Sequence, residues 1–440
     1  MLIRKGAFLQ YIFIVFFIFF TSACTLKNGL LVQEVQDLKT IPQNVKSYTA
    51  GIDEGYISTI AQYRKKYFAI WNKKDINSSH ADVMWAYRVF TPKNSYGENL
   101  QHIKQDFFDK MLENSHFQNY GTLNRPALTL RAVNLRTFPS KKPLFLDPKR
   151  AGEGFPFDYL QNSSIGPNKP VVVSHYSKDK AWVYILSSFA SGWVDSRDIV
   201  FIPEKEKNIW QEAQQVVYTK DNVPLFDEKG NFLFYSRIGT MAPLIDVNQS
   251  SNRVLTVNKN SNSQIYFHAS KLSSEVSHKG LLQFNTKNIN EIIEALQKMN
   301  YGWGGMYGQR DCSSTMRDFF APFGIWLPRN SAEQSKVGKV ISLKGLSNKQ
   351  KIQRIKQEAI PFQTLLYKRG HIVLYVGIKN EKVVIFQNVW GVKTLQNHKA
   401  GRHIIGRTIF STLEVGKNLY YYDPSASLLT HLESMNIVTD

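Results

Sequence analysis

The sequence contains two cysteines among 440 residues, and one of them, Cys312, lies where a thiol can act as a nucleophile. It follows Asp311 at the expected start of a helix, directly after a glycine-rich turn. Unpaired backbone N–H groups there would favour a thiolate and receive an oxyanion. Downstream, His371 begins an expected strand over residues 371–377, which places its imidazole at the mouth of a sheet. We therefore interpret Cys312 and His371 as nucleophile and general base, in preference to a core thiol and a structural histidine.

A histidine that acts as a base needs a group to orient it, and the following strand offers two amides. Residues 382–386 are expected to form the antiparallel partner of the strand that begins at His371. A turn centred on Lys379 would place Gln387 opposite His371, whereas a two-residue loop starting at Lys379 would place Asn388 there. Either amide oxygen could accept the imidazole N–H, and the sequence leaves both possibilities open.

The other cysteine, Cys24, ends an apolar leader. Two basic residues precede a nearly continuous apolar run, residues 7–20, which is too short to span a bilayer comfortably but suits a secretory signal. The small residues 21–23 before Cys24 resemble the lipobox of bacterial lipoproteins, which implies cleavage before Cys24 and its acylation. Thr21 departs from that motif, so ordinary cleavage with a free Cys24, or an uncleaved anchor helix, are the alternatives. Each alternative places the rest of the chain outside the cytoplasm.

Composition narrows the class of protein. Hydrophobic residues make up 43% of the chain, and this length favours several domains. The formal net charge is +20, but basic residues are scattered rather than gathered in runs. This pattern favours a solvated face, or attraction to an anionic envelope, over a nucleic-acid partner. The remaining histidines lack ligand-like spacing, so neither a metal nor a cofactor is expected.

The chain divides into the leader, residues 1–23, and four blocks. Residues 24–125 carry apolar positions at helical spacing, and we expect a helical domain that braces the others. Residues 126–202 and 203–270 contain short strands separated by turn residues, which predicts two small barrels. Residues 271–440 mix helices and strands and contain the cysteine and the histidine. The predicted fold class is therefore multidomain α+β.

Helix caps can be predicted at two places in the last block. Asn288 and Glu291 have capping-box spacing ahead of an apolar stripe at residues 289, 292, 293, 296 and 299. Asn330 and Glu333 have the same spacing. For Asn330, a capping role competes with a direct contact to substrate.

Several motifs together resemble those of the NlpC-type, papain-like cell-wall cysteine peptidases. They are Tyr301-Gly302-Trp303-Gly304-Gly305, Asp311-Cys312-Ser313-Ser314, Leu327-Pro328-Arg329-Asn330-Ser331, Gly370 to Gly377 and Phe386 to Gly391. The sequence most resembles the branch of this family that has a helical N-terminal stabilising domain and two bacterial SH3-like barrels before the peptidase. The resemblance thus implies these identities for the blocks 24–125, 126–202, 203–270 and 271–440.

The resemblance also implies a reaction and roles for residues. Members of that branch cleave the bond between γ-D-glutamate and an L-diamino acid, meso-diaminopimelate, in peptidoglycan stem peptides, without a cofactor. The implied catalytic residues are Cys312, His371 and Gln387, the last at a position that is most often histidine. The implied substrate-binding residues are Asp311, Ser313, Asn330, Ser331, Tyr301 and Trp303. Asn330 stands where many relatives have an aspartate that binds a free amine, so a weaker preference for that amine is expected. Packing beneath the glycine-rich turn is the alternative role of Tyr301 and Trp303.

Two further interpretations compete with this endopeptidase. Gln387 and Asn330 are compatible with a wall-binding lipoprotein that holds stem peptides, or a partner, without turnover. The second interpretation is an enzyme that transfers the acyl group to an amine, or an amidase that acts on the lactyl link. The expected partners are stem peptides and, through an acylated Cys24, a lipid membrane. We expect a monomer in the periplasm of the cell envelope, with the outer membrane favoured.

Overall fold

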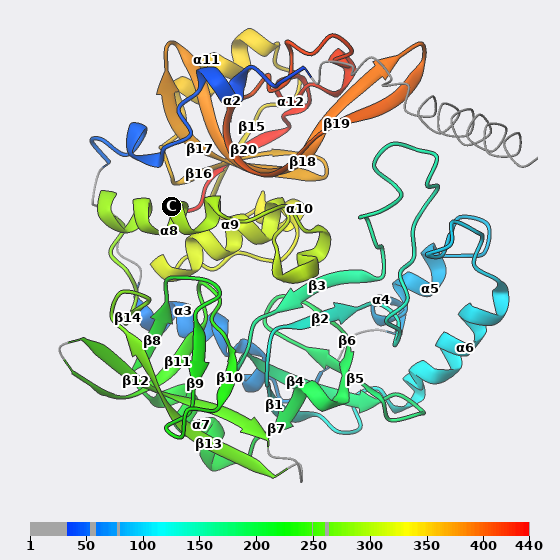
Figure 1. The fold of residues 1–440 in the computed structure, drawn as a ribbon, viewed down its shortest axis with the longest axis vertical. Coiled ribbons are helices and arrows are strands. Elements are labelled where there is room, and N and C mark those ends of the chain that lie inside the picture. The colour runs from blue at the N-terminus through cyan, green and yellow to red at the C-terminus, as the bar shows by residue number, and fades with distance from the viewer. Residues whose placement is uncertain (1–32, 53–58, 77–79, 249, 260–263, 440) are drawn as a thin grey trace, which may run out of the picture.

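The computed structural model describes residues 33–439 except 53–58, 77–79, 249 and 260–263. The predicted leader and Cys24 lie outside this part of the chain. Figure 1 shows helices α8 (Thr286–Gln297) and α9 (Cys312–Phe320) between the C-terminal sheet on one side and the two barrels on the other. Within the described residues, no helix is both long and apolar enough to cross a membrane.

The N-terminal segment runs along the other parts of the molecule (Figure 1). Its helices are α2 (Asp37–Thr40), η1 (Val45–Ser47), α3 (Ile60–Tyr67), η2 (Ala69–Asn72), α4 (His80–Val83), α5 (Trp85–Val89), α6 (Gln105–Ser115) and η3 (Phe117–Asn119). α2 lies against strand β19 (Lys399–Thr412) of the C-terminal sheet. There Asp37 accepts hydrogen bonds from the backbone N–H and the hydroxyl of Thr412.

Helices α3 and α6 lie within the block predicted to be helical, residues 24–125, and each packs against a barrel. Tyr67 of α3 is buried in a core that also contains Trp193 of the first barrel and Met241 of the second. Phe108 of α6 packs edge-on against Phe138 of the first barrel. The N-terminal segment therefore braces the rest of the molecule through buried aromatic contacts.

The first barrel is an antiparallel sheet with the order β3-β2-β6-β5-β4-β1-β7. Its strands are β1 (Arg125–Thr129), β2 (Val133–Arg136), β3 (Gln161–Ile165), β4 (Pro170–Tyr176), β5 (Trp182–Leu186), β6 (Ser191–Asp195) and β7 (Ile199–Phe201), with η4 (Ser196–Asp198) before the last. β1 ends at Thr129, and the N–H of Leu130 donates to the carbonyl of Asp198.

The second barrel follows helix α7 (Glu204–Glu212) and has the order β13-β12-β11-β8-β14 beside a β9-β10 hairpin. Its strands are β8 (Gln215–Tyr218), β9 (Pro224–Phe226), β10 (Phe232–Tyr235), β11 (Met241–Val247), β12 (Ser251–Lys259), β13 (Ile265–Ser273) and β14 (Ser277–Lys279). The hairpin turns at residues 228–231, with Gly230 at positive φ. The predicted boundary at residue 270 falls inside β13, and β14 pairs with β8 beyond it.

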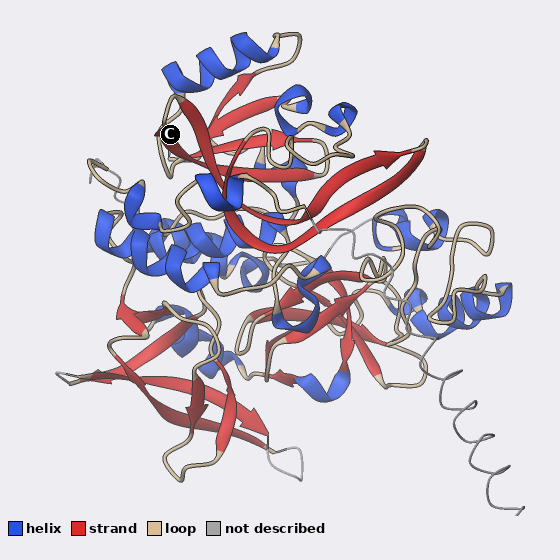
Figure 2. Ribbon diagram, turned by 45° about the horizontal axis from the view of Figure 1, so that its top comes forward, coloured by secondary structure: helices blue, strands red, loops and turns tan. Residues whose placement is uncertain are grey.

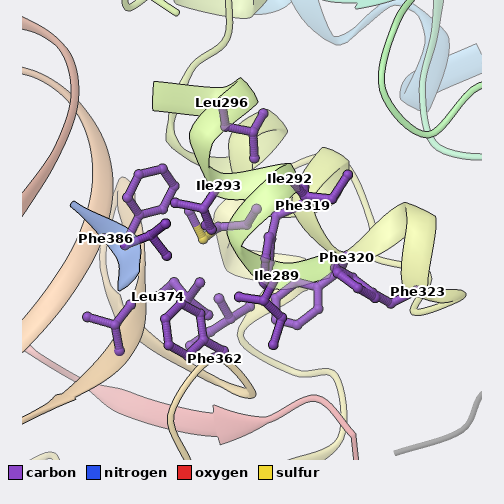
Figure 3. Close-up of a cluster of buried hydrophobic side chains, with 14 of the residues drawn as sticks. Ile289, Ile292, Ile293, Leu296, Phe319, Phe320, Phe323, Phe362, Leu374 and Phe386 are labelled. Carbon is purple, nitrogen blue, oxygen red and sulfur yellow. The ribbon is translucent and has the colours of Figure 1, made fainter. Parts of the chain in front are cut away.

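The C-terminal block combines a sheet of order β15-β20-β16-β17-β18-β19 with helices on its faces. Besides α8, α9 and β19, its elements are η5 (Trp303–Gly308), η6 (Ala321–Phe323), α10 (Ser331–Gln334), β15 (Lys339–Ser342), α11 (Asn348–Glu358), β16 (Thr364–Lys368), β17 (His371–Lys379), β18 (Lys382–Gln396), η7 (Pro424–Ala426), α12 (Leu428–His431) and β20 (Ser434–Ile437). Figure 3 shows Ile289, Ile292, Ile293 and Leu296 of α8 pointing into one buried cluster with Phe386 of the sheet. The predicted apolar stripe of this helix therefore faces the core.

The cap predicted for α8 at Asn288 is wrong by one turn. The helix begins at Thr286, and its N-cap is Asn285, whose side chain accepts from the N–H of Asn288. The hydroxyl of Thr286 donates to the carbonyl of Thr49. A tertiary contact with the N-terminal segment thus supports the additional turn.

The β18-β19 hairpin is much longer than the predicted return strand over 382–386. β18 continues to Gln396 and pairs with β19 along nearly its whole length, so that the hairpin projects beyond the sheet (Figure 1). Near its outer part, Arg402 lies against the first barrel, where a Cβ on Gly152 would come within 3.2 Å of its guanidinium. The α+β multidomain fold is as predicted, and Figure 2 shows strands in separate sheets with helices between and around them.

Candidate active site

Cys312 is the first residue of α9, and the chain before it is held from both sides. The Asp311 side chain accepts from the N–H of Ser314 at 2.8 Å, and the Ser314 hydroxyl accepts from the N–H of Asp311 at 2.9 Å. This capping box defines where the helix begins. Asn388 of β18 donates to the carbonyl of Arg310 at 2.8 Å. The thiol therefore lies in the first helical turn, as predicted.

A line of hydrogen bonds orients His371. The Ser411 hydroxyl donates to the carbonyl of Thr412 at 3.1 Å, so it accepts from the Gln387 amide nitrogen, which lies 2.7 Å away. The Gln387 oxygen then faces His371 Nε2 at 2.8 Å, and this nitrogen must carry the proton. Nδ1 is therefore the unprotonated nitrogen that is free to act as a base.

The structure brings Gln387, and not Asn388, to His371, although neither predicted turn is correct. The β17-β18 hairpin turns at Asn380-Glu381, both at positive φ as in a type I′ turn. A bulge follows, and the register then places Leu374 opposite Phe386. Continued to the start of β17, this register sets His371 opposite Val389. Gln387 is its diagonal neighbour on the same face, and diagonal neighbours remain within reach of long side chains.

The catalytic candidates line one cavity of about 390 Å³. Its wall also includes the predicted residues Tyr301 and Trp303, together with Gly152 and Phe157 of the first barrel. The remaining predicted substrate-binding residues lie outside the described lining: Asp311, Ser313, Asn330 and Ser331. The structure thus brings Cys312, His371, Gln387, Tyr301 and Trp303 together around the cavity, with Asp311 and Ser313 next to Cys312 but outside the described lining.

The glycine-rich turn that carries Trp303 is seated on the first barrel. A Cβ on Gly304 would lie 2.4 Å from the carbonyl oxygen of Gln161, and one on Gly305 would lie 2.1 Å from the hydroxyl of Ser164. The indole N–H of Trp303 donates to the carbonyl of Asp158 at 3.0 Å. The glycines are therefore needed because strand β3 approaches the turn closely.

The carboxylate of Asp311 is engaged by Arg329. The guanidinium lies 2.6 Å from Asp311 Oδ2, donates to the Ser313 hydroxyl at 2.9 Å and donates to the Ser163 hydroxyl of the first barrel at 2.7 Å. Burial opposes ionisation of Asp311, but Arg329 and the cap hydrogen bonds outweigh it and hold its pKa below the ordinary value. The motif around Arg329 does not reveal these contacts, because Asp311 and Ser163 lie 18 and 166 positions away in the chain.

Asn330 caps a helix. Its side-chain oxygen accepts from the N–H of Glu333 at 2.9 Å, and Ser331 is the first residue of α10. The side chain is thereby committed to the start of α10, outside the described cavity lining.

Burial sets the protonation of the catalytic candidates. It raises the pKa of Cys312 to about 12, and Asp311 adds to this, against hydrogen bonds from the N–H groups of Ile372 and Ser313. Burial also lowers the pKa of His371 to about 4, although Gln387 favours the charged ring. Both shifts favour a neutral thiol and a neutral imidazole in the unliganded site, against the thiolate that the first-turn N–H groups favour.

The chain thus combines a helical segment, two barrels and an α+β domain in which a helix-borne cysteine lines one cavity with a sheet-borne histidine and amide. Four family models match the chain: the N-terminal NLPC_P60 stabilising domain at 13–120, the SH3 domain of SH3b1 type at 143–195, the SH3 domain of SH3b2 type at 204–247, and the NlpC/P60 family at 298–404. The chain belongs to the NlpC/P60 family, in the branch with the stabilising domain and two SH3 domains.

A solved structure shares this architecture. An NlpC/P60 endopeptidase from Photobacterium damselae subsp. piscicida is similar with a TM-score of 0.77 and 21% identity, over 91% of this chain and 98% of that one. An NlpC/P60 family protein from Bacillus cereus ATCC 10987 has a TM-score of 0.47 and 15% identity, over 72% of this chain and 100% of that one. No curated protein matches the chain in sequence. The first comparison supports the same fold for nearly the whole described chain.

Proposed function

We propose that this protein is a peptidoglycan hydrolase, a cysteine endopeptidase that cleaves the bond between γ-D-glutamate and the L-diamino acid of stem peptides. Membership of the NlpC/P60 family and the similarity to an NlpC/P60 endopeptidase support a peptidase that acts on the cell wall. One observation carries the proposal. The hydrogen bonds from Thr412 through Ser411 and Gln387 give His371 a basic nitrogen in the cavity that Cys312 also lines.

The reaction is an acyl transfer through the thiol. As the sulfur of Cys312 attacks the γ-glutamyl carbonyl, His371 Nδ1 takes the thiol proton. N–H groups at the start of α9 stabilise the oxyanion. The imidazolium then gives its proton to the leaving amine, and water, activated by His371, hydrolyses the thioester. Gln387 holds the ring in place throughout but, as a neutral amide, adds no negative charge to stabilise the imidazolium.

Defined muropeptides test this reaction. The purified protein should release fragments that end in D-glutamate, and Cys312→Ala should release none, with both products identified by mass spectrometry. Binding of the peptides without turnover by both proteins would instead indicate a wall-binding module. Products formed at the lactyl link, or carrying a new amide, would indicate an amidase or a transferase.

We further propose that the protein resides in the periplasm as a monomer, tethered to the outer membrane by acylated Cys24. The apolar run followed by small residues before Cys24 supports export and acylation. Cells that express the wild type should incorporate labelled palmitate into the protein and retain it in the membrane fraction. Cys24→Ser should remain unlabelled and leave that fraction. Light scattering of the Cys24→Ser protein, which is not held in the membrane, should give the monomer mass. Palmitate labelling of Cys24→Ser would contradict the assignment of Cys24 as the acylated residue.

A further inference from the structure

The candidate catalytic cavity contains unpaired positive charge. Lys368, at the end of β16, and Arg402, on β19, both line it together with Cys312. Among the residues that the structure describes, neither side chain forms an ion pair or a hydrogen bond. Lys393 lines the same cavity but differs, because its ammonium lies 2.7 Å from Asp423 Oδ2. The side chains of Lys368 and Arg402 are thus available to bind a ligand in the cavity.

The described lining contains no aspartate or glutamate, although the charge of Asp423 outside it partly offsets the effect of burial on Arg402. The pKa of Lys368 is lowered first by burial and then by the charge of Arg402, and burial also lowers that of Arg402. Two cations that disfavour each other inside a partly desolvated cavity are stabilised when an anion enters.

The positions of these cations are set by structure on both sides of the cavity. Lys368 pairs in register with His371 across the β16-β17 hairpin, so it lies directly beside the general base. Arg402 is carried in by the long β18-β19 hairpin and rests against Gly152, where the missing side chain leaves room for the guanidinium. Lys368 therefore lies at the reacting end of the cavity, and Arg402 is near enough to lower the pKa of Lys368.

We propose that Lys368 and Arg402 bind a free carboxylate of the stem peptide close to the scissile bond and discriminate against peptides in which it is amidated. This inference rests on the proposed function and specifies the substrate class of the same site. A γ-linked D-glutamate keeps its α-carboxylate free, and a diamino acid has carboxylates of its own. The bound carboxylate can therefore come from either of these two residues of the stem peptide. Arginine and lysine favour such a group through charge-assisted hydrogen bonds.

Binding measurements separate this inference from catalysis. Calorimetric titration of full-length Cys312→Ala would use the tripeptide L-Ala-γ-D-Glu-meso-diaminopimelate and two derivatives. One carries an amide at the D-glutamate α-carboxylate, and the other carries amides at the diamino acid carboxylates. The same titrations would be made with Lys368→Gln and Arg402→Gln added together to Cys312→Ala. Lys379→Gln on β17, the strand next to that of Lys368, and Lys399→Gln on β19, the strand of Arg402, are the matched controls for lost charge, because both lysines lie outside the cavity lining.

One amidated derivative should bind about 10- to 100-fold more weakly than the free acid, as expected for a lost charge-assisted hydrogen bond, and its identity names the carboxylate. In the Lys368/Arg402 variant that difference should fall below about 3-fold, while the lysine controls keep it. Equal binding of all three peptides, no binding of any, or an unchanged difference in the variant would overturn the proposal. Wild-type protein that binds selectively but does not cleave would overturn only the proposed hydrolysis.

Discussion

His371 is oriented by a neutral partner. Gln387 is 1% exposed, and its amide is held by Ser411, so its oxygen cannot turn away from the imidazole without losing a buried hydrogen bond. A buried amide group without a partner is unfavourable, which keeps this geometry stable in the absence of substrate. What the residue supplies is direction for the ring, whereas a carboxylate would also supply charge.

Substitutions of Gln387 should therefore separate the effect of orienting the His371 ring from the effect of a negative charge beside it. Gln387→Leu removes the acceptor, and kcat/KM is expected to fall about 100-fold, within the range for a displaced general base. Gln387→Glu restores the acceptor and should retain most activity while raising the pKa of His371. Steady-state kinetics on a defined tripeptide would show this, with thermal unfolding as the control for folding. Equal activity of Gln387→Leu and wild type would remove Gln387 from the mechanism.

The protonation of the catalytic candidates predicts an unusual pH profile. With the pKa of His371 at about 4 and that of Cys312 at about 12, the reactive neutral pair exists between these values. The value of kcat/KM should therefore rise as the pH increases through about 4 and then stay level beyond about pH 9. A thiolate–imidazolium pair would instead lose activity as its imidazolium deprotonates at mildly alkaline pH. An alkaline decline below about pH 9 would contradict the neutral pair.

At the scale of elements, the second barrel holds the start of the catalytic helix. Arg310, fully buried two residues before Cys312, donates to Asp318 of α9 at 2.8 Å and to Asp221 of the second barrel at 2.9 Å. Arg237 of the same barrel donates to Asp318 at 3.2 Å. These ion pairs connect the second barrel to Arg310, just before α9, and to Asp318 within α9. The barrel nevertheless contributes no residue to the described cavity lining.

Removing one partner of this buried network should be costly. Asp221→Asn leaves the Arg310 charge without full compensation, and the free energy of unfolding should fall by about 3 kcal/mol. Urea unfolding would measure it, with Asp106→Asn as control, because its pair with Lys110 is exposed on α6 and should change little. Equal stabilities of the two variants would show that the barrel does not clamp α9.

At the scale of the whole molecule, one aromatic-rich core joins parts that are distant in the sequence. It contains residues of α3, of both barrels and, at Ala321, of the peptidase domain. His175 lies at its edge, where the ring contacts the carbonyl of Ser115 at 2.9 Å and the hydroxyl of Ser174 at 3.0 Å. A shared core of this kind makes independent motion of the domains unfavourable.

This buried histidine predicts acid destabilisation. Burial lowers the pKa of His175 to about 4. Between about pH 6.5 and 4 the unfolded chain therefore binds a proton that the folded chain does not, and stability falls as the pH falls. Thermal unfolding across this range should show the decline, and His175→Gln should reduce it by roughly 2 kcal/mol. The exposed His398→Gln is the control, and a pH dependence equal in all three proteins would refute the role of His175.

Local patterns were sufficient for much of this protein. The helix start at Cys312, the cap at Asn330 and the apolar stripe of α8 depend on neighbours within a few positions, so their sequence signals are complete. Side-chain parity could not separate Gln387 from Asn388, because the turn and the bulge that set the register were not predictable.

The sequence by itself indicated the candidate nucleophile and base, the candidate orienting amides and the order of the domains, since each depends on short-range spacing. Only the tertiary structure decided that Gln387 orients His371, that Arg329 engages Asp311, and that Lys368 and Arg402 share the cavity. It also revealed the burial that favours a neutral thiol. These features arise where segments far apart in the chain exclude water together, and both desolvation and ion pairing depend on that arrangement rather than on local sequence.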